Sequence, residues 1–152
     1  MNADSARSID LGIRTMDSGY HLLQVLLYRA RSRMRTQCLD ASIRMLELLE
    51  VMVSDSEEPY NGIIWQLMCS PFTPFLILFG EILANGSIEA AEKERFLAAM
   101  ERFPDFLAKM SLRSSLATKL ERVAVVFVEH ARSVIHQGKP TSLFFVQTTM
   151  TD

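Results

Sequence analysis

The chain has 152 residues, of which 49% are hydrophobic and 22% charged, a composition typical of one folded domain and unlike that of a disordered segment. Its net charge of −2 excludes a broadly basic surface that would attract nucleic acid or an anionic membrane. The two cysteines, Cys38 and Cys69, lack zinc-binding spacing, which predicts no metal site and a reduced, intracellular setting.

The N-terminal third of the chain follows a helical pattern, because its apolar residues recur at intervals of three and four. Ser18-Gly19 is expected to interrupt this pattern, and the polar sequence SDSEEPYNG to end it. A short helix then opens at Pro59. The three helices expected before the polar sequence cover residues 5–16, 20–33 and 36–53.

A strongly apolar helix is expected next, within the sequence CSPFTPFLILFGEIL. Thr73 is a good N-cap and Pro74 suits the first helical position, while Asn85-Gly86 is a strong stop after Ala84. From Pro74 to Ala84 the helix would measure about 16 Å, roughly half the hydrocarbon thickness of a bilayer. This length excludes a membrane anchor and predicts a helix of the protein core.

Two residues of this helix depart from its apolar character. Apolar residues otherwise lie all round it, which predicts a central helix that its neighbours cover on most sides. Gly80 weakens the helix and indicates either a close helix crossing or space for another group. Glu81 must reach solvent, contact a basic partner or remain protonated.

The remaining sequence predicts further amphipathic helices and a tail. One helix runs to Phe103 and is broken by Pro104, and a long helix covers residues 114–136. Residues 139–152 are expected to be extended. Because there is no internal repeat and no linker, the sequence predicts a single all-α domain over residues 1–152. We expect a bundle of six to eight helices around the central apolar helix.

Two segments carry a resemblance to a known family, QCLDASIRMLELLEVMV and WQLMCSPFTPFLILFGEILANGSIEAAEKERFLAAMERF. They resemble the C-terminal half of the fungal-specific transcription factor domain, the middle homology region. A Cys-x-x-Ala helix, Cys38 to Ala41, precedes a PF-x-PF-x-x-LF helix over residues 71–79, and the resemblance spans roughly residues 35–135. It implies an all-α regulatory domain. Members that bind DNA use a separate cluster of six cysteines and two zinc ions, which this sequence lacks.

The sequence has one basic run, formed by Arg29, Arg31, Arg33 and Arg35. At every second position, these side chains spread round a helix and do not form one stripe. A solvated helix end accounts for such a run. The sequence therefore predicts no direct contact with nucleic acid.

Three ionisable residues, Glu81, His21 and His130, are candidate catalytic groups. Each has a plain structural interpretation as well, as a surface glutamate or as a hydrogen-bonded helix histidine. Glu81 could also be the polar group of an apolar ligand pocket. The residues expected to line that pocket are Tyr60, Trp65, Met68, Phe72, Phe75, Phe79 and Glu81. The alternative is that these aromatic and methionine side chains belong to the core.

Three functions are compatible with the sequence. The first is a nuclear regulatory or interaction module that binds a partner protein or an apolar effector. The second is a cytoplasmic enzyme of secondary metabolism, a cyclase or isomerase of a hydrophobic small molecule. It would need no cofactor, because such chemistry can rest on shape, desolvation and one or two hydrogen bonds. The third is a dimerisation protein that forms a homodimer.

The regulatory function is preferred because it follows the resemblance. A closed pocket beside Glu81 and Trp65 would favour the enzyme. A broad exposed apolar face would favour a regulatory or dimerisation module, because such patches usually mark protein interfaces.

Overall fold

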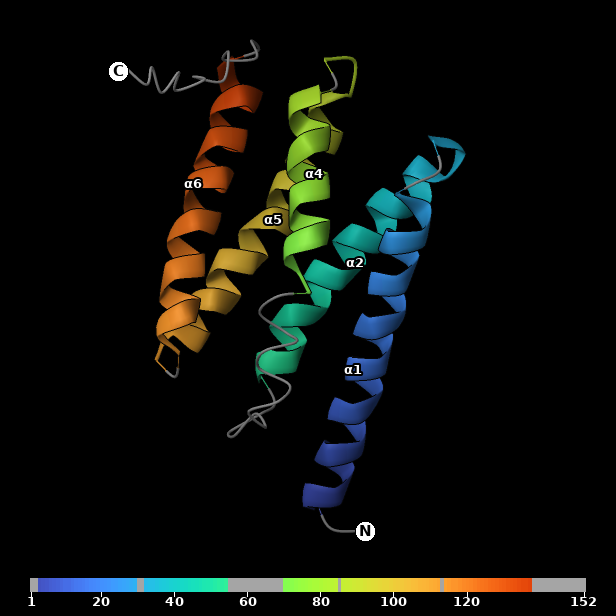
Figure 1. Ribbon diagram of the computed structural model, residues 1–152, viewed down its shortest axis with the longest axis vertical. Coiled ribbons are helices and arrows are strands. Elements are labelled where there is room, and N and C mark those ends of the chain that lie inside the picture. The colour runs from blue at the N-terminus through green and yellow to red at the C-terminus, as the bar shows by residue number, and fades with distance from the viewer. Residues whose placement is uncertain (1–2, 30–31, 55–69, 85, 113, 138–152) are drawn as a thin grey trace, which may run out of the picture.

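Five α-helices and one 3₁₀ turn make up the regular structure of the described residues (Figure 1). The structure is a computed structural model that describes residues 3–29, 32–54, 70–84, 86–112 and 114–137. Within these ranges there is no strand, so the all-α prediction is confirmed, while six to eight helices are not. The elements are α1 (Ala3–Tyr28), η1 (Ser32–Met34), α2 (Arg35–Ser54), α4 (Phe72–Ala84), α5 (Ala90–Ser111) and α6 (Ser115–Gln137).

Two of the expected helix breaks do not occur. Ser18-Gly19 lies inside α1, where a glycine lowers helix stability by only about 1 kcal/mol. Pro104 lies inside α5, although a proline removes one backbone hydrogen bond and costs about 3 kcal/mol. Phe103 and Phe106, on either side of it, are both buried and hold the helix against the core. Tertiary packing therefore overrides the local preference at Pro104, whereas the cost of one glycine is too small to break α1 at Ser18-Gly19.

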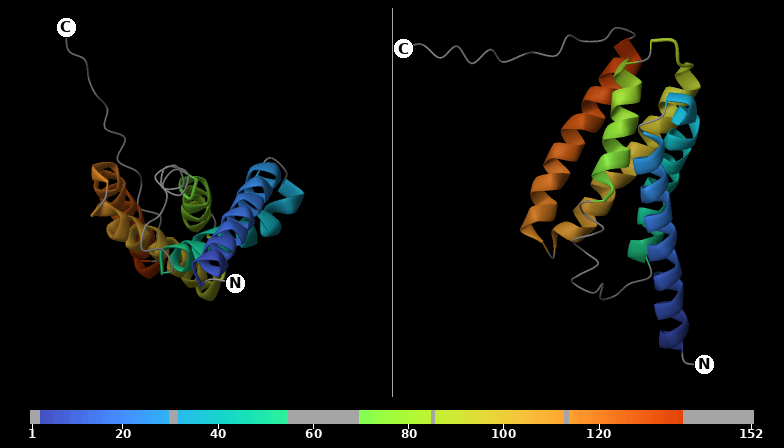
Figure 2. Two further views of the ribbon diagram at one scale, coloured as in Figure 1. Left: turned by 90° about the horizontal axis from the view of Figure 1, so that it is seen from below. Right: turned by 45° about the vertical axis from the view of Figure 1, so that its right-hand side comes forward.

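The main hydrophobic core lies between α2, α4, α5 and α6. Phe75 of α4 is fully buried, and its ring centroid lies 5.3 Å from that of Phe103 and 6.1 Å from that of Phe127. Leu78 and Ile82 are buried on the same side of the helix. As predicted, α4 is a central helix, which contacts each of the other described α-helices, and Figure 2 shows it between α6 and α1.

The opposite side of α4 is less covered than its sequence predicts. Leu76 and Gly80 are exposed, although the sequence of α4 places apolar side chains on nearly every side of the helix. This flank faces α1, which packs chiefly on α2 and has few contacts with α4. The N-terminal half of α1 extends beyond the ends of the other helices (Figures 1 and 2). A small second core, formed by Val25, Cys38 and Ala41, joins α1 to α2.

Some expectations fall on residues that the structure does not describe. The extended tail predicted over residues 139–152 lies outside the described residues, as does the short helix expected at Pro59. None of the described helices is long and apolar enough to cross a membrane.

Candidate functional site

An open groove of about 460 Å³ lies between the C-terminal end of α1, the start of α2 and the exposed flank of α4. Cys38 and Leu39 of α2 line it together with Tyr28 of α1. On the α4 side, Ile77 and Gly80 line it, and a Cβ on Gly80 would meet no atom of the described residues within 4 Å. The glycine therefore marks open space and not a close helix crossing.

Three charged side chains also line this groove. Arg29 and Arg35 line it together with Glu81. The Arg35 Nε donates a hydrogen bond of 3.1 Å to Oε2 of Glu81, and Nη2 of the same arginine donates to Oε1. Glu81 was expected to reach solvent, contact a basic partner or remain protonated, and the structure shows contact with a basic partner. Two guanidinium groups and one carboxylate leave the groove with an excess of positive charge.

Cys38 is the buried polar group of the groove. Its Sγ lies 3.7 Å from the carbonyl oxygen of Val25, to which the thiol donates. Burial raises the pKa of the Cys38 thiol, and Ser42 and Arg29 oppose this by smaller amounts. A thiol that stays protonated at neutral pH is a poor nucleophile, so Cys38 is suited to packing and not to covalent chemistry.

The three phenylalanines expected to line a ligand pocket face the other side of α4. Phe72 stacks edge-on against Phe103 at 5.0 Å, and Phe79 against Phe127 at 4.7 Å, while Phe75 is fully buried between them. In the described residues these rings and Glu81 therefore do not share one cavity. Tyr60, Trp65 and Met68 lie outside the described residues. The binding role of these six residues remains a prediction.

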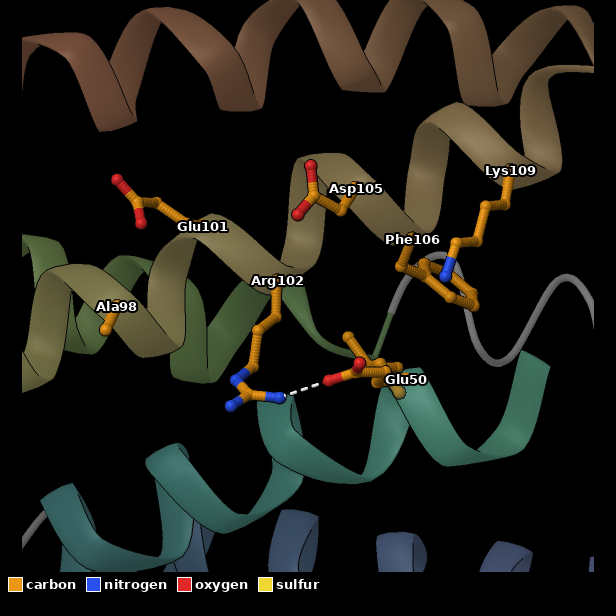
Figure 3. Close-up of a pocket in the computed structure, with 8 residues that line it drawn as sticks. Glu50, Ala98, Glu101, Arg102, Asp105, Phe106 and Lys109 are labelled. Atoms are coloured by element: carbon orange, nitrogen blue, oxygen red, sulfur yellow. Dashed lines mark hydrogen bonds and ion pairs between the residues drawn. The ribbon is translucent and has the colours of Figure 1, made fainter. Parts of the chain in front are cut away.

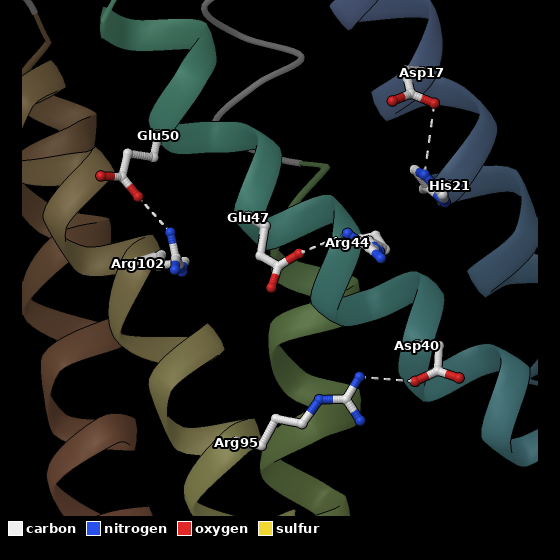
Figure 4. Close-up of polar contacts among 8 residues, drawn as sticks. All are labelled: Asp17, His21, Asp40, Arg44, Glu47, Glu50, Arg95 and Arg102. Carbon is white, nitrogen blue, oxygen red and sulfur yellow. Dashed lines mark hydrogen bonds and ion pairs between the residues drawn. The ribbon is translucent and has the colours of Figure 1, made fainter.

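A second hollow, of about 270 Å³, lies between α2 and α5 and is lined by charged side chains (Figure 3). Arg102 of α5 forms an ion pair there with Glu50 of α2. Further along the same helix pair, Arg95 lies 3.2 Å from Asp40 (Figure 4). These two ion pairs join α2 to α5, and the pair of Arg102 with Glu50 balances two of the charged groups that line the hollow.

A third hollow, of about 380 Å³ between α1 and α2, contains His21. The Nε2 of His21 lies 3.6 Å from an oxygen of Asp17 (Figure 4), and its Nδ1 lies 3.0 Å from the Gln24 amide oxygen. Arg44 and Glu47 of α2, themselves 3.5 Å apart, line the other side. The charged groups of this hollow thus contact one another along their own helices.

His130 of α6 lies in a different part of the molecule. Its ring centroid is 6.0 Å from that of Phe79, and its Nε2 is buried without a hydrogen-bond partner in the described part of the chain. Glu81, His21 and His130 therefore occupy three separate sites and form no acid–base pair. Among the described residues, no three His, Cys, Asp or Glu side chains come together as a metal site.

Comparison with known proteins gives one informative match. A curated protein named "Transcriptional regulator" from Claviceps purpurea (strain 20.1) is 28% identical over 155 residues. The match covers 100% of this chain and 25% of that protein, so the chain spans about a quarter of the regulator's length. No family model matches, and the fungal transcription factor domain is not confirmed. No solved structure matches either. The similarity hints at a regulatory role.

Sequence reasoning found one edge of the groove and missed the rest. Gly80 and Glu81 were identified as unusual in an apolar helix, and both line the groove. Tyr28 and Cys38 were not identified, because they belong to other helices whose placement no local pattern reveals. The sequence signal for the groove is Gly80, which has no side chain and lies on the open flank of α4.

Proposed function

We propose that this chain is a regulatory module that binds an apolar small molecule carrying one acidic group in the groove between α1, α2 and α4. The observation that carries this proposal is the combination, in one groove, of an apolar lining with an excess of positive charge. Leu39, Leu76 and Ile77 supply the apolar surface, and Arg29 and Arg35 supply the charge.

The size and chemistry of the groove support such a ligand. Small-molecule sites typically measure about 300–1,000 Å³ and combine apolar walls with a few polar groups. Arginine is suited to a carboxylate or sulfonate, because its guanidinium can donate two parallel hydrogen bonds. Since Glu81 already accepts from Arg35, the ligand's acidic group is expected nearer to Arg29.

The position of α1 suggests how binding is transmitted. α1 has few contacts with α4, and the groove lies where these two helices face each other above α2. A ligand in the groove would bridge Tyr28 of α1 and Ile77 of α4. It would stabilise the arrangement in which the two helices are held together, and a partner protein would recognise that state. The module would act in the nucleus without contacting DNA itself.

The regulatory function is preferred to the cyclase or isomerase for two reasons. The three candidate acid–base residues occupy separate sites, whereas α1 exposes a broad apolar face of the kind found at protein interfaces. The similar Claviceps protein is also named a regulator.

Anilinonaphthalene sulfonate, an aromatic anion, is a direct probe of the groove. The test is Gly80→Leu, which places a side chain in the open space and improves helix propensity by up to about 1 kcal/mol. We expect the variant to remain folded and to bind the probe at least tenfold more weakly in a fluorescence titration. Ala108→Leu, which adds the same side chain at an exposed position of α5, is the matched control.

Protection of an exposed thiol in the groove gives a second measurement. Leu76 is exposed and lines the groove, so in a Cys38→Ala, Cys69→Ser background the bound probe should slow alkylation of the thiol introduced by Leu76→Cys. Equal probe binding by the wild type and Gly80→Leu, with no protection of this thiol, would refute binding in the groove.

A further inference from the structure

α1 carries an exposed apolar stripe on the side that faces away from the bundle. Its five side chains are between 58% and 78% exposed. The residues of the stripe are Ile13, Met16, Tyr20, Leu23 and Leu27. Single exposed apolar residues are ordinary on protein surfaces, but five on one face of one helix indicate an interface.

The stripe follows the spacing of a coiled coil. Its residues alternate at intervals of three and four, as the a and d positions of a heptad do. Among the described side chains of α1, Ser18 and Val25 are buried; they are also one heptad apart and lie on the opposite face. α1 thus packs on α2 through one face and presents the apolar stripe on the other.

Two glycines border the stripe at the same spacing. Gly12 and Gly19 are seven residues apart on one edge of it, and a Cβ at either position would meet no described atom within 4 Å. Nothing in the described part of the monomer therefore requires a glycine at these positions, and each one weakens the helix. Small residues at one edge of an apolar seam allow a second helix to approach closely.

We propose that the stripe of α1 is a homodimer interface, in which the α1 helices of two copies pack as a short coiled coil. The five side chains expose on the order of 700 Å², close to the roughly 800 Å² that each partner contributes to a standard interface. A second copy also matches the repeat of the stripe, because a two-fold axis pairs the same heptad face with itself.

The charges beside the stripe are compatible with self-association. Arg14 and Asp10 form an ion pair of 2.8 Å one turn apart on α1, and His21 lies 3.6 Å from Asp17. The Arg14–Asp10 pair balances two of the charges beside the stripe, which reduces the repulsion between two copies that meet there. The proposal does not depend on ligand binding in the groove.

Sedimentation velocity of the full chain over the micromolar range tests the interface. We expect the wild type to reach twice the 17.3 kDa mass of one chain. Leu23→Glu, which puts a charge in the centre of the stripe, should raise the dissociation constant at least about 100-fold. Val126→Glu, at a similarly exposed position of α6, should leave it unchanged. Circular dichroism establishes that each variant is folded.

The glycines give an independent variant that does not disturb folding. Gly12→Ala with Gly19→Ala should raise the melting temperature of the dilute monomer and raise the dissociation constant about tenfold, because the added methyl groups separate the helices. A wild type that stays at the mass of one chain would mean that another segment or protein covers the stripe, and it would overturn the proposal. A dimer that persists in the Leu23→Glu variant would also overturn the proposal.

Discussion

Arg35 and Glu81 are 46 residues apart in the sequence, and the guanidinium of the first donates two hydrogen bonds to the carboxylate of the second. The pair joins the start of α2 to the second half of α4 beside the groove. The Glu81 side chain is only 13% exposed, whereas that of Arg35 is 50% exposed. The carboxylate is thus charged in a largely apolar helix because a cation reaches it from the neighbouring helix.

Glu81→Gln should keep the fold and lower the free energy of unfolding by about 0.5–1 kcal/mol, because a half-exposed ion pair contributes little more than this. Urea denaturation of Glu81→Gln, Arg35→Gln and the double variant measures the coupling energy. Salt should reduce that coupling. Additive effects of the two single changes would show that the pair adds no stability.

Phe75→Ala should destabilise the protein by about 3–5 kcal/mol, because the side chain is fully buried among the rings of Phe72, Phe103 and Phe127. Leu76→Ala is a matched control on the next residue, since Leu76 is 43% exposed at the groove. We expect a loss below about 1 kcal/mol for this control. Similar losses for the two variants in urea denaturation would contradict the described orientation of α4.

The buried thiol of Cys38 should make stability depend on alkaline pH. Its pKa is raised in the folded state, so the unfolded chain loses this proton first, near about pH 8.5. The thiol's contribution to stability is complete below that pH and is lost as pH rises towards the folded pKa. In a Cys69→Ser background, the free energy of unfolding should therefore fall more steeply above that pH than in the same background with Cys38→Ala. Parallel curves would contradict a raised pKa.

His130→Leu should leave stability unchanged or raise it by about 1 kcal/mol. The Nε2 of His130 is buried without a partner in the described residues, and leucine removes this polar atom while keeping apolar contact with Phe79. Thermal unfolding measures the effect. Glu129→Leu, at an exposed position of the same helix, controls for a general effect of leucine on α6. A loss of several kcal/mol for His130→Leu would mean that the imidazole makes a structural hydrogen bond.

The sequence predicts the helices well and their ends less well. Apolar periodicity locates α2 and α6 to within a few residues. The apolar helix expected from Pro74 is α4, but it begins two residues earlier, at Phe72, so Thr73 is not its N-cap. The break expected at Pro104 does not occur, because the buried Phe103 and Phe106 outweigh a cost of about 3 kcal/mol, and α1 continues through Ser18-Gly19 because one glycine costs only about 1 kcal/mol. The described residues therefore contain fewer helices than expected, because helices merge at these two positions and the helix expected at Pro59 lies outside the described residues.

The groove is beyond sequence reasoning for a different reason. An apolar helix such as α4 looks the same whether neighbours cover every side or leave one flank open. Only the relative position of α1 and α4 exposes Leu76 and leaves the space beside Gly80. The partner of Glu81 could not be predicted either, because Arg35 is one of four arginines in the basic run and no local pattern distinguishes it from the other three.

The division of the interior into two cores affects how the molecule opens. The large core unites α2, α4, α5 and α6, whereas α1 is attached through the small cluster around Val25. α1 is thus expected to detach while the other four helices stay assembled, and its amide hydrogens should exchange with solvent ahead of theirs. Two molecules can exchange a helix that is attached through so small a cluster, so this fold can form domain-swapped dimers.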